Sequence, residues 1–335
     1  MKKQLTILTT FILLSMTILM AQSKDIRWLM DTTITVMKAN AVNRDKVDWE
    51  SIESNVHSQI VTVQNGYQLG PVCRYLFQSL SDFHGAFYCG DSTFKWKRPG
   101  HAISDSIMNE WRKGGRVRKE VLAHRIGYLR VPSIPFDPDR SKLDAKSQSL
   151  SDSLCALLKD GVTGVILDLR LDNGGAMYPM MLGLEQLLGQ GKIGSFEGSG
   201  NQSWIVKDNN FYLDTLLLTT INPNCQIPKK DMPVVVLIGP GTGSSGEFLA
   251  MAFKNRKNTL FIGSESAGYV TSTHGFPIND AVSVLLAVGY GRDRTGHVYE
   301  KALLPDIINK DPDSFNNIPN DKKVILAANW IELTR

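Results

Sequence analysis

The stretch Gly239-Pro-Gly-Thr-Gly-Ser-Ser-Gly-Glu247 has the composition of a turn that presents a reactive hydroxyl. It lies between an apolar run at 233–239, which predicts a buried strand, and a helical pattern at 247–254. A hydroxyl on a tight strand-to-helix turn stands clear of the sheet, and the N–H groups that follow it can stabilise an oxyanion. From this stretch alone, an N-capping serine in a glycine-rich turn is the alternative. A phosphate-binding loop is disfavoured because the Lys-Ser/Thr that should follow is absent.

A second segment carries groups that such a hydroxyl would need. Gly164-Val-Ile-Leu-Asp-Leu-Arg-Leu-Asp-Asn-Gly-Gly175 is a continuous apolar strand followed by two glycines, which can present backbone N–H groups to a ligand or an oxyanion. Its acids do not form a calcium loop, because the alternating residues are apolar and the twelfth position is Pro179. Asp168 and Arg170 are expected to pair with each other or with nearby backbone.

His84 is the favoured proton acceptor among the six histidines. It lies in a glycine-containing turn directly after a predicted helix and two residues after an acid. The pKa of histidine near neutrality suits a general base. His274, in Thr271-Ser-Thr-His-Gly275, is the competitor for this role. The remaining histidines fall on a helix face or in polar connections: His57, His101, His124 and His297.

The elements that must position these residues change character along the chain. Residues 25–80 have a helical pattern, in which Asp48 is expected to cap a helix that begins at Trp49. From 122 onward strands and helices alternate, which predicts an α/β core with parallel strand pairing. The polar stretch 196–230 is interpreted as a hairpin or lid. The expected strands are 126–131, 164–170, 233–239 and 259–263, and the expected helices are 143–160, 177–188, 247–254 and 322–333.

The first 21 residues have the layout of a secretory signal peptide: Lys2 and Lys3, an apolar stretch at 5–20, and Ala21. We predict cleavage after Ala21, which places the folded protein outside the cytoplasm, in the periplasm or the extracellular space. The alternative is an uncleaved N-terminal anchor that faces outward, although the apolar stretch is slightly short for a membrane span. No cysteine ends this stretch, so a lipid anchor is not indicated.

Composition narrows the class of protein further. The chain has 42% hydrophobic and 21% charged residues, as ordinary globular proteins do. Its formal charge of +4 is carried by scattered basic residues, so neither nucleic acid nor a membrane surface is an expected partner. We expect no stable membrane insertion after signal cleavage.

The four cysteines of an exported chain can form disulfides. Cys73–Cys89 is the expected pair because both residues flank the His84 turn, and Cys155 is interpreted as a small buried hydrophobic residue. The cysteine spacings do not match a zinc site, so we expect no metal and no cofactor.

Together these segments resemble the tail-specific, or C-terminal-processing, serine protease family. The resemblance covers about residues 43–310 and rests on five segments in the family's order. Alignment on Glu247 places the family's nucleophile at Ser244 rather than Ser245. The segments are the His84 turn, the strand at 126–131, Asp168-Leu-Arg-Leu-Asp-Asn-Gly-Gly175, Thr242-Gly-Ser-Ser-Gly-Glu247, and Asp293-Arg-Thr-Gly296 through Tyr299-Glu300 to Pro305-Asp306.

Two departures from the family pattern restrict the resemblance to one branch. Many members carry a catalytic lysine 25 residues after the serine, where this chain has Tyr269. Most members also carry a PDZ domain after the histidine turn, and the residues between His84 and Ile126 are too few to hold one. Both departures point to the PDZ-lacking branch that looks like the nisin resistance protein and the tricorn protease core, where a serine works with a histidine.

The resemblance implies a crotonase-like (ClpP/crotonase) α/β protease core at 121–335 and a helical N-terminal domain and cap at 22–120 that carries the histidine turn. Ser244 would attack a peptide carbonyl, and His84 would accept its proton and return it to the leaving amine. The N–H groups of Ser245 and of Gly174 or Gly175 would form the oxyanion hole.

Three further residues receive supporting roles from the same resemblance. Glu300 is the candidate that orients His84, Glu247 is expected to support the nucleophile turn through backbone contacts, and Tyr269 lines the cleft or packs. The expected substrate is a peptide or the unstructured tail of a protein. The alternative function is a catalytically inactive module that binds peptides or hydrophobic ligands on the same fold. The sequence indicates neither the cleavage specificity nor the oligomeric state.

Overall fold

The structure is a computed structural model that describes residues 25–97, 102–198, 200–225, 229 and 231–334. The predicted signal peptide at 1–21 lies outside these residues. The described chain divides into two compact units. Unit 1 contains the described residues up to 97 together with Ser272–Gly289, and unit 2 contains 102–271 and the residues from Tyr290 onward.

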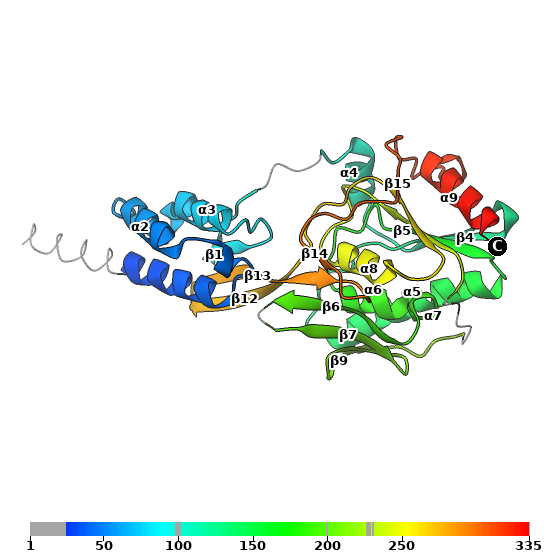
Figure 1. The fold of residues 1–335 in the computed structure, drawn as a ribbon, viewed down its shortest axis with the longest axis horizontal. Coiled ribbons are helices and arrows are strands. Elements are labelled where there is room, and N and C mark those ends of the chain that lie inside the picture. Colours follow the sequence, from blue (N-terminus) through cyan, green and yellow to red (C-terminus); the bar gives the residue numbers. More distant parts are fainter. Residues whose placement is uncertain (1–24, 98–101, 199, 226–228, 230, 335) are drawn as a thin grey trace, which may run out of the picture. The chain divides into compact units, whose positions relative to one another are not determined.

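Unit 1 combines helices with a small antiparallel sheet. Asp48 accepts hydrogen bonds from the N–H groups of Glu50 and Ser51 at 3.1 and 3.3 Å, which confirms the predicted start of α2. Apolar side chains of the helices and strands form one core that includes Phe77 and Val284. In Figure 1 the orange strands β12 and β13 lie with the blue helices of this unit. Its elements are a helix over 25–40, η1 (Arg44–Lys46), α2 (Trp49–Ile60), η2 (Gly66–Gln68), α3 (Gly70–Ser79), β1 (Ala86–Cys89), β2 (Ser92–Phe94), β12 (Thr271–Asn279) and most of β13 (Val282–Arg292).

The boundary between the units differs from the one expected at residues 120 and 121. Helix α4 (Asp105–Arg112) and strand β3 (Arg118–Leu122) belong to unit 2, whereas Ser272–Gly289 belongs to unit 1. The cause is a long-range strand pairing, because β13 lies antiparallel to β1, with Ala86 opposite Leu285. Such a pairing joins segments that are remote in the sequence, and local patterns carry no signal for it.

Unit 2 is built on a six-stranded sheet with the order β15-β11-β10-β5-β4-β3. Its strands are parallel except β3, which lies antiparallel to β4, so the predicted α/β core with parallel pairing is confirmed. The central strands β4, β5 and β10 are buried on both faces, as their continuous apolar runs predict. The remaining strands are β4 (Ile126–Arg130), β5 (Gly164–Asp168), β10 (Val234–Ile238), β11 (Thr259–Gly263) and β15 (Ile307–Ile308).

Alternate residues of the central strands contact different layers of unit 2. Val165 and Leu167 of β5 belong to the large core that contains α5 (Arg140–Lys159), α6 (Met177–Gly183) and α8 (Ser245–Phe253). Ile166 instead packs with the C-terminal helix α9 (Lys322–Leu333). The sheet therefore has a helical layer on each face, and the loops at the carboxyl ends of β5 and β10 carry the glycine pair and Ser244.

Several elements differ in detail from the expected ones. The helix expected at 177–188 is interrupted at Leu184 and continues as α7 (Glu185–Leu188). The polar stretch expected to form a hairpin or lid is a series of antiparallel strands. Helix α8 begins at Ser245, two residues before the expected start. The strands are β6 (Gly191–Gly198), β7 (Gln202–Lys207), β8 (Asn210–Leu213) and β9 (Leu216–Thr220), and the short elements of unit 2 are η3 (Ala123–Arg125), β14 (Val298–Tyr299) and η4 (Ile318–Asn320).

The disulfide lies in unit 2 and is not the expected one. Cys155 on α5 is bonded to Cys225, with 5.6 Å between the Cα atoms. Cys73 and Cys89 are free thiols buried in the core of unit 1, so the expected Cys73–Cys89 pair was wrong. Proximity in the sequence favoured that pair, but the packing of α5 against β9 determines which sulfur atoms meet.

Within the described ranges, every helix is too short or too polar to span a membrane.

Candidate active site

Ser244 occupies the turn between β10 and α8 in a strained backbone conformation. Its φ of 52° and ψ of −118° lie in a region that non-glycine residues rarely adopt, at a cost of about 1–3 kcal/mol. The turn is held by Thr242, whose hydroxyl donates to Leu169 O at 2.9 Å and accepts the Gly239 N–H at 3.1 Å. A strained serine between a buried strand and a helix N-terminus is the geometry of a nucleophile elbow.

Glu247, in the first turn of α8, connects this elbow to the loop after β11. Its Oε2 accepts the Ser244 N–H at 2.9 Å, and its Oε1 accepts the Ser266 hydroxyl at 2.5 Å and the Gly268 N–H at 2.8 Å. Burial raises the pKa of the Glu247 carboxyl to about 7, against the opposing effect of these hydrogen bonds. The contacts within unit 2 fit the expected supporting role of Glu247.

The glycine pair lies directly against the serine turn. Gly174 and Gly175 have φ values of 117° and 111°, which favour glycine strongly. A Cβ on Gly174 would lie 2.8 Å from the Ser244 Cβ, and one on Gly175 would lie 2.0 Å from Ile134 O. Only glycine therefore allows the two loops to approach this closely.

The hydrogen bonds distinguish between the two glycines as oxyanion donors. The Gly174 N–H donates to Asp172 Oδ1 at 3.1 Å and is thus engaged within the protein. Ser245 Oγ donates to Gly175 O at 2.5 Å. Within the part of the chain that the structure describes, the backbone N–H groups of Gly175 and Ser245 have no acceptor. These two donors are the ones open to an incoming oxygen.

A neighbouring loop supports the glycine pair. The Ser133 hydroxyl donates to Asn173 Oδ1 at 2.6 Å and accepts the Asn173 N–H at 2.9 Å. The Ala176 N–H donates to Ile134 O at 2.7 Å. These bonds flank the pair on both sides and restrict its backbone, so the open N–H groups are preorganised.

A buried ion-pair network lies beneath these loops. Arg170 bonds Asp168 at 2.7 Å, which confirms their expected pairing, and it also reaches Asp321 at 2.8 Å and Asp313 at 2.7 Å. Burial opposes ionisation of Asp168, but Arg170 and the Tyr128 hydroxyl hold the pKa of this carboxyl below its usual value. The network anchors the end of β5 from which the glycine loop departs.

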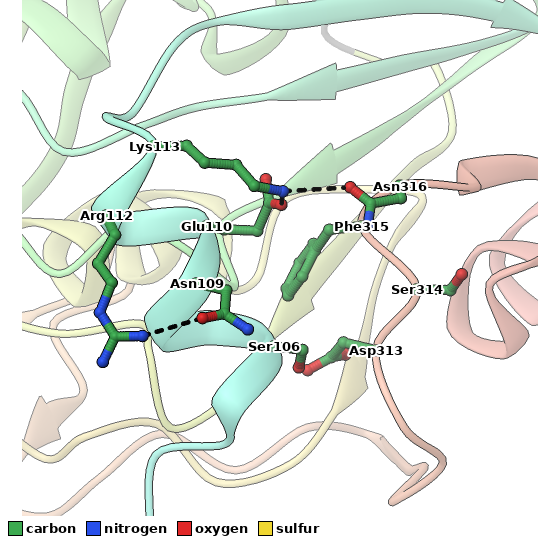
Figure 2. A pocket seen from close by; sticks show the side chains of 9 residues that line it. All are labelled: Ser106, Asn109, Glu110, Arg112, Lys113, Asp313, Ser314, Phe315 and Asn316. Atoms are coloured by element: carbon green, nitrogen blue, oxygen red, sulfur yellow. Dashed lines mark hydrogen bonds and ion pairs between the residues drawn. The ribbon is translucent and has the colours of Figure 1, made fainter.

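Helix α4 braces both loops from one side. The indole of Trp111 donates to Leu171 O at 2.9 Å. Ile107 and Trp111 pack over Gly241, where the absence of a side chain leaves room for them. Other residues of α4 border a cavity of about 560 Å³. Figure 2 shows this cavity, with Lys113 bonded to Glu110 and Asn316, and Arg112 bonded to Asn109. None of the candidate catalytic residues lines the cavity.

His84 lies in unit 1, in a turn that Asp82 organises. Asp82 Oδ1 accepts the N–H groups of His84 and Gly85 at 3.0 and 2.7 Å, and Oδ2 accepts the Ala287 N–H at 2.9 Å. Burial raises the pKa of the Asp82 carboxyl, and the three backbone donors oppose this rise. The acid two residues before His84 therefore fixes the backbone that carries the half-buried imidazole.

The structure brings together six of the predicted residues within unit 2: Ser244, Ser245, Gly174, Gly175, Glu247 and Tyr269. The side chain of Tyr269 is 38% exposed, and its ring lies 3.8 Å from the position of a Cβ on Gly243. Glu300 is an exposed residue just after β14 in the same unit, while His84 and the competitor His274 belong to unit 1.

The local residue pattern indicates no functional role for Asp172. Its side chain is completely buried and lies at the junction of the two loops. The acid directly before the glycine pair was visible in the sequence, but its burial was not. Among the described residues, no three His, Cys, Asp or Glu side chains gather as a metal site would require.

The sequence profile described as peptidase family S41 matches residues 125–308, which is more than half of the chain. This protein therefore belongs to peptidase family S41 and has the mixed α/β fold of these proteases. The expected resemblance to the C-terminal-processing proteases is confirmed.

Individual relatives agree with this assignment. The chain is 35% identical over 154 residues to the nisin-resistance protein of Lactococcus lactis, covering 45% of this chain and 48% of that protein. It is 24% identical over 204 residues to the carboxy-terminal processing protease CtpB of Bacillus subtilis, covering 60% of this chain and 37% of that protein. The chain thus spans half or less of the length of these relatives.

Two solved structures share the fold at low sequence identity. A lipoprotein from Streptococcus agalactiae has a TM-score of 0.65 at 18% identity, with 92% of this chain and 96% of that chain covered. The photosystem II D1 C-terminal processing protease has a TM-score of 0.53 at 14% identity, with 84% and 92% covered.

Proposed function

We propose that this protein is an exported serine endopeptidase in which Ser244 is the nucleophile and His84 the general base. The observation that carries the proposal is the strained Ser244 elbow, which lies against a glycine pair with an open N–H group. The α/β core is proposed to be crotonase-like, with the helices of unit 1 acting as a cap. The proposed substrates are peptides or unstructured protein tails outside the cytoplasm.

The proposed reaction is acyl transfer through a covalent intermediate. Ser244 Oγ attacks the scissile carbonyl, His84 accepts the hydroxyl proton, and the same imidazole then protonates the leaving amine. Water, activated by His84, hydrolyses the acyl-enzyme. The N–H groups of Ser245 and Gly175 stabilise the oxyanion, and one such donor is typically worth a factor of about 10²–10³ in kcat.

Two acids are proposed to position His84. Asp82 holds the backbone of the His84 turn through three hydrogen bonds, so the imidazole starts from a defined backbone position. Glu300 is retained as the candidate that orients the ring. Glu247 is proposed to support the turn that carries Ser244, and Tyr269 is proposed to line the site next to it.

A covalent probe and a cleavage assay together test this function. Purified protein is treated with a fluorophosphonate, and the labelled residue is located by peptide mapping. Cleavage of an unstructured peptide library is followed by mass spectrometry for the wild type, Ser244→Ala and His84→Ala. Loss of a member of a catalytic unit costs about 10⁴–10⁶ in turnover. His274→Ala is the matched control for the competing histidine.

We expect the label on Ser244 and the loss of cleavage in Ser244→Ala and His84→Ala, both of which should remain folded. Retained cleavage in Ser244→Ala would contradict the proposal. Activity that depends on His274 instead of His84 would assign the base elsewhere. A wild type that binds peptide without cutting it would identify a binding module in place of an enzyme.

A further inference from the structure

Asp172 is a buried acid that joins the two loops of the candidate site. Its side chain has an exposed fraction of 0%. Its Oδ1 accepts the Gly174 N–H at 3.1 Å, and its backbone oxygen accepts the Gly243 N–H at 2.9 Å. One residue thereby connects the glycine pair to the turn that carries Ser244.

The carboxyl group of Asp172 has no charged partner in the described part of the chain. Its Oδ2 is buried and makes no hydrogen bond there. The N-terminus of α8 packs on it so closely that a Cβ on Gly246 would lie 2.9 Å from the Asp172 Cγ. An ionised carboxylate that is buried without a cation carries a large desolvation cost.

The charged groups on the elements around Asp172 are bonded to other residues. Glu247 on α8 accepts from Ser244, Ser266 and Gly268. Arg170, at the end of β5, is bonded to Asp168, Asp313 and Asp321. On α4, Glu110 pairs with Arg130 and Lys113, and Arg112 bonds Asn109. None of these groups compensates a charge on Asp172.

We propose that Asp172 is a positioning residue that works as a neutral carboxylic acid, and that the loss of its proton switches off peptide hydrolysis. The proposal rests on the proposed function of the same site. In the neutral form, the carbonyl oxygen of the acid accepts the Gly174 N–H and holds the loop in place. In the ionised form, a buried negative charge beside the loop opposes the negative charge that develops on the oxyanion.

The direction of the pH dependence follows from this arrangement. Burial raises the pKa of the Asp172 carboxyl from 3.8 to about 8, with the Gly174 N–H opposing the rise. The acid is therefore mostly protonated at pH 7 and loses its proton as the pH passes 8. The kcat of the wild type should therefore fall by about tenfold per pH unit above pH 8. Deprotonation of a histidine base has the opposite effect, because it raises kcat as the pH increases.

Asp172→Asn and Asp172→Ala separate the neutral-acid role from simple packing. Asparagine keeps the shape and the acceptor for Gly174 and cannot ionise, whereas alanine removes both. The values of kcat and KM are measured from pH 6 to pH 10 for both variants, the wild type and the exposed control Asp311→Asn. We expect Asp172→Asn to retain kcat at pH 7 within about threefold and to stay active above pH 9. Asp172→Ala should lose kcat at every pH with a smaller change in KM, and the control should overlay the wild type.

Two results would overturn the proposal: an Asp172→Asn variant as inactive as Asp172→Ala at pH 7, or the same alkaline decline in the wild type and Asp172→Asn. A second readout does not depend on turnover. In protein labelled with ¹³C at aspartate carboxyls, one resonance should titrate near pH 8 and be missing from Asp172→Asn. If the wild type cleaves no peptide, the peptidase assignment fails, and this titration still decides the state of Asp172. An Asp172 carboxyl that is already ionised at pH 6 would refute the neutral acid.

Discussion

Glu247 Oε2 accepts the backbone N–H of Ser244 at 2.9 Å, so the strained residue is held by a side chain from the helix whose N-cap it is. The other oxygen of the same carboxyl receives a hydroxyl and an N–H group from the loop after β11. The conformation of Ser244 therefore depends on both carboxyl oxygens of the buried Glu247. A change to either oxygen should allow the backbone of Ser244 to relax.

Replacement of Glu247 by glutamine should damage both stability and activity. Glutamine has the same shape, but its NH₂ group would face one of the N–H or hydroxyl donors that the carboxylate accepts. A buried donor without an acceptor costs about 1–3 kcal/mol in the free energy of unfolding. We also expect kcat to fall by at least about tenfold. Urea unfolding and peptidase kinetics measure both effects. Glu332→Gln, in the C-terminal helix, is the control and should change neither; wild-type behaviour of Glu247→Gln would refute this account.

Replacement of Gly175 by alanine should remove activity. The new Cβ would lie 2.0 Å from Ile134 O, at a residue whose φ is 111°. The loop must then move, and the Gly175 N–H leaves its position beside Ser244. Gly275→Ala is the matched control, because nothing lies within 4 Å of the Cβ at that position. Peptidase assays and circular dichroism distinguish the two variants. If Gly175→Ala retains full activity, the loop is not the oxyanion site.

Loss of the buried arginine should destabilise unit 2 far more than loss of a surface lysine. Arg170→Ala leaves Asp168 and Asp321 buried without their cation, at a typical cost of about 3–5 kcal/mol. Lys142→Ala removes a pair with Asp137 in which the lysine side chain is 63% exposed, and solvent screens such a pair so that it contributes little to stability. Denaturant titration measures both values. Equal effects of the two substitutions would show that the network is not a structural anchor.

The disulfide assignment predicts which thiols react. Unfolded, unreduced protein should take up iodoacetamide at Cys73 and Cys89 only, and reduction should expose Cys155 and Cys225. The bond closes a loop across a sequence separation of 70, which is worth about 4 kcal/mol in the chain-entropy treatment. The double variant Cys155→Ser, Cys225→Ser should lose a comparable amount, and a reductant should not lower its stability further. Labelling of Cys155 before reduction would contradict the assignment.

The free energy of unfolding should fall as the pH rises from about 4 to about 8. Burial raises the pKa of Asp172 to about 8 and that of Glu247 to about 7, so the folded protein binds these protons more tightly than the unfolded chain. Each group removes about 1.4 kcal/mol per pH unit inside its window. Asp172→Asn should therefore gain stability over the wild type as the pH rises, whereas the exposed Asp280→Asn should run parallel to it. Parallel curves for Asp172→Asn would show that Asp172 does not titrate in this range.

The sequence by itself determined the features that depend on short segments. The apolar runs at 164–170 and 233–239 predicted buried parallel strands, because a strand covered on both faces needs apolar residues at every position. Asp48 predicted a helix start through its own side chain. Ser244 and the glycine pair were visible because such turns require particular residue types at adjacent positions.

Only the tertiary structure decided the features that depend on distant partners. It paired Cys155 with Cys225, placed Ser272–Gly289 in unit 1, and buried Asp172 against the turn at Gly243. The physical reason is the same in each case. Burial and hydrogen bonding of these groups are set by segments that meet through packing, and a local residue pattern contains neither the partner nor the loss of solvent that gives an acid such as Asp172 its chemistry.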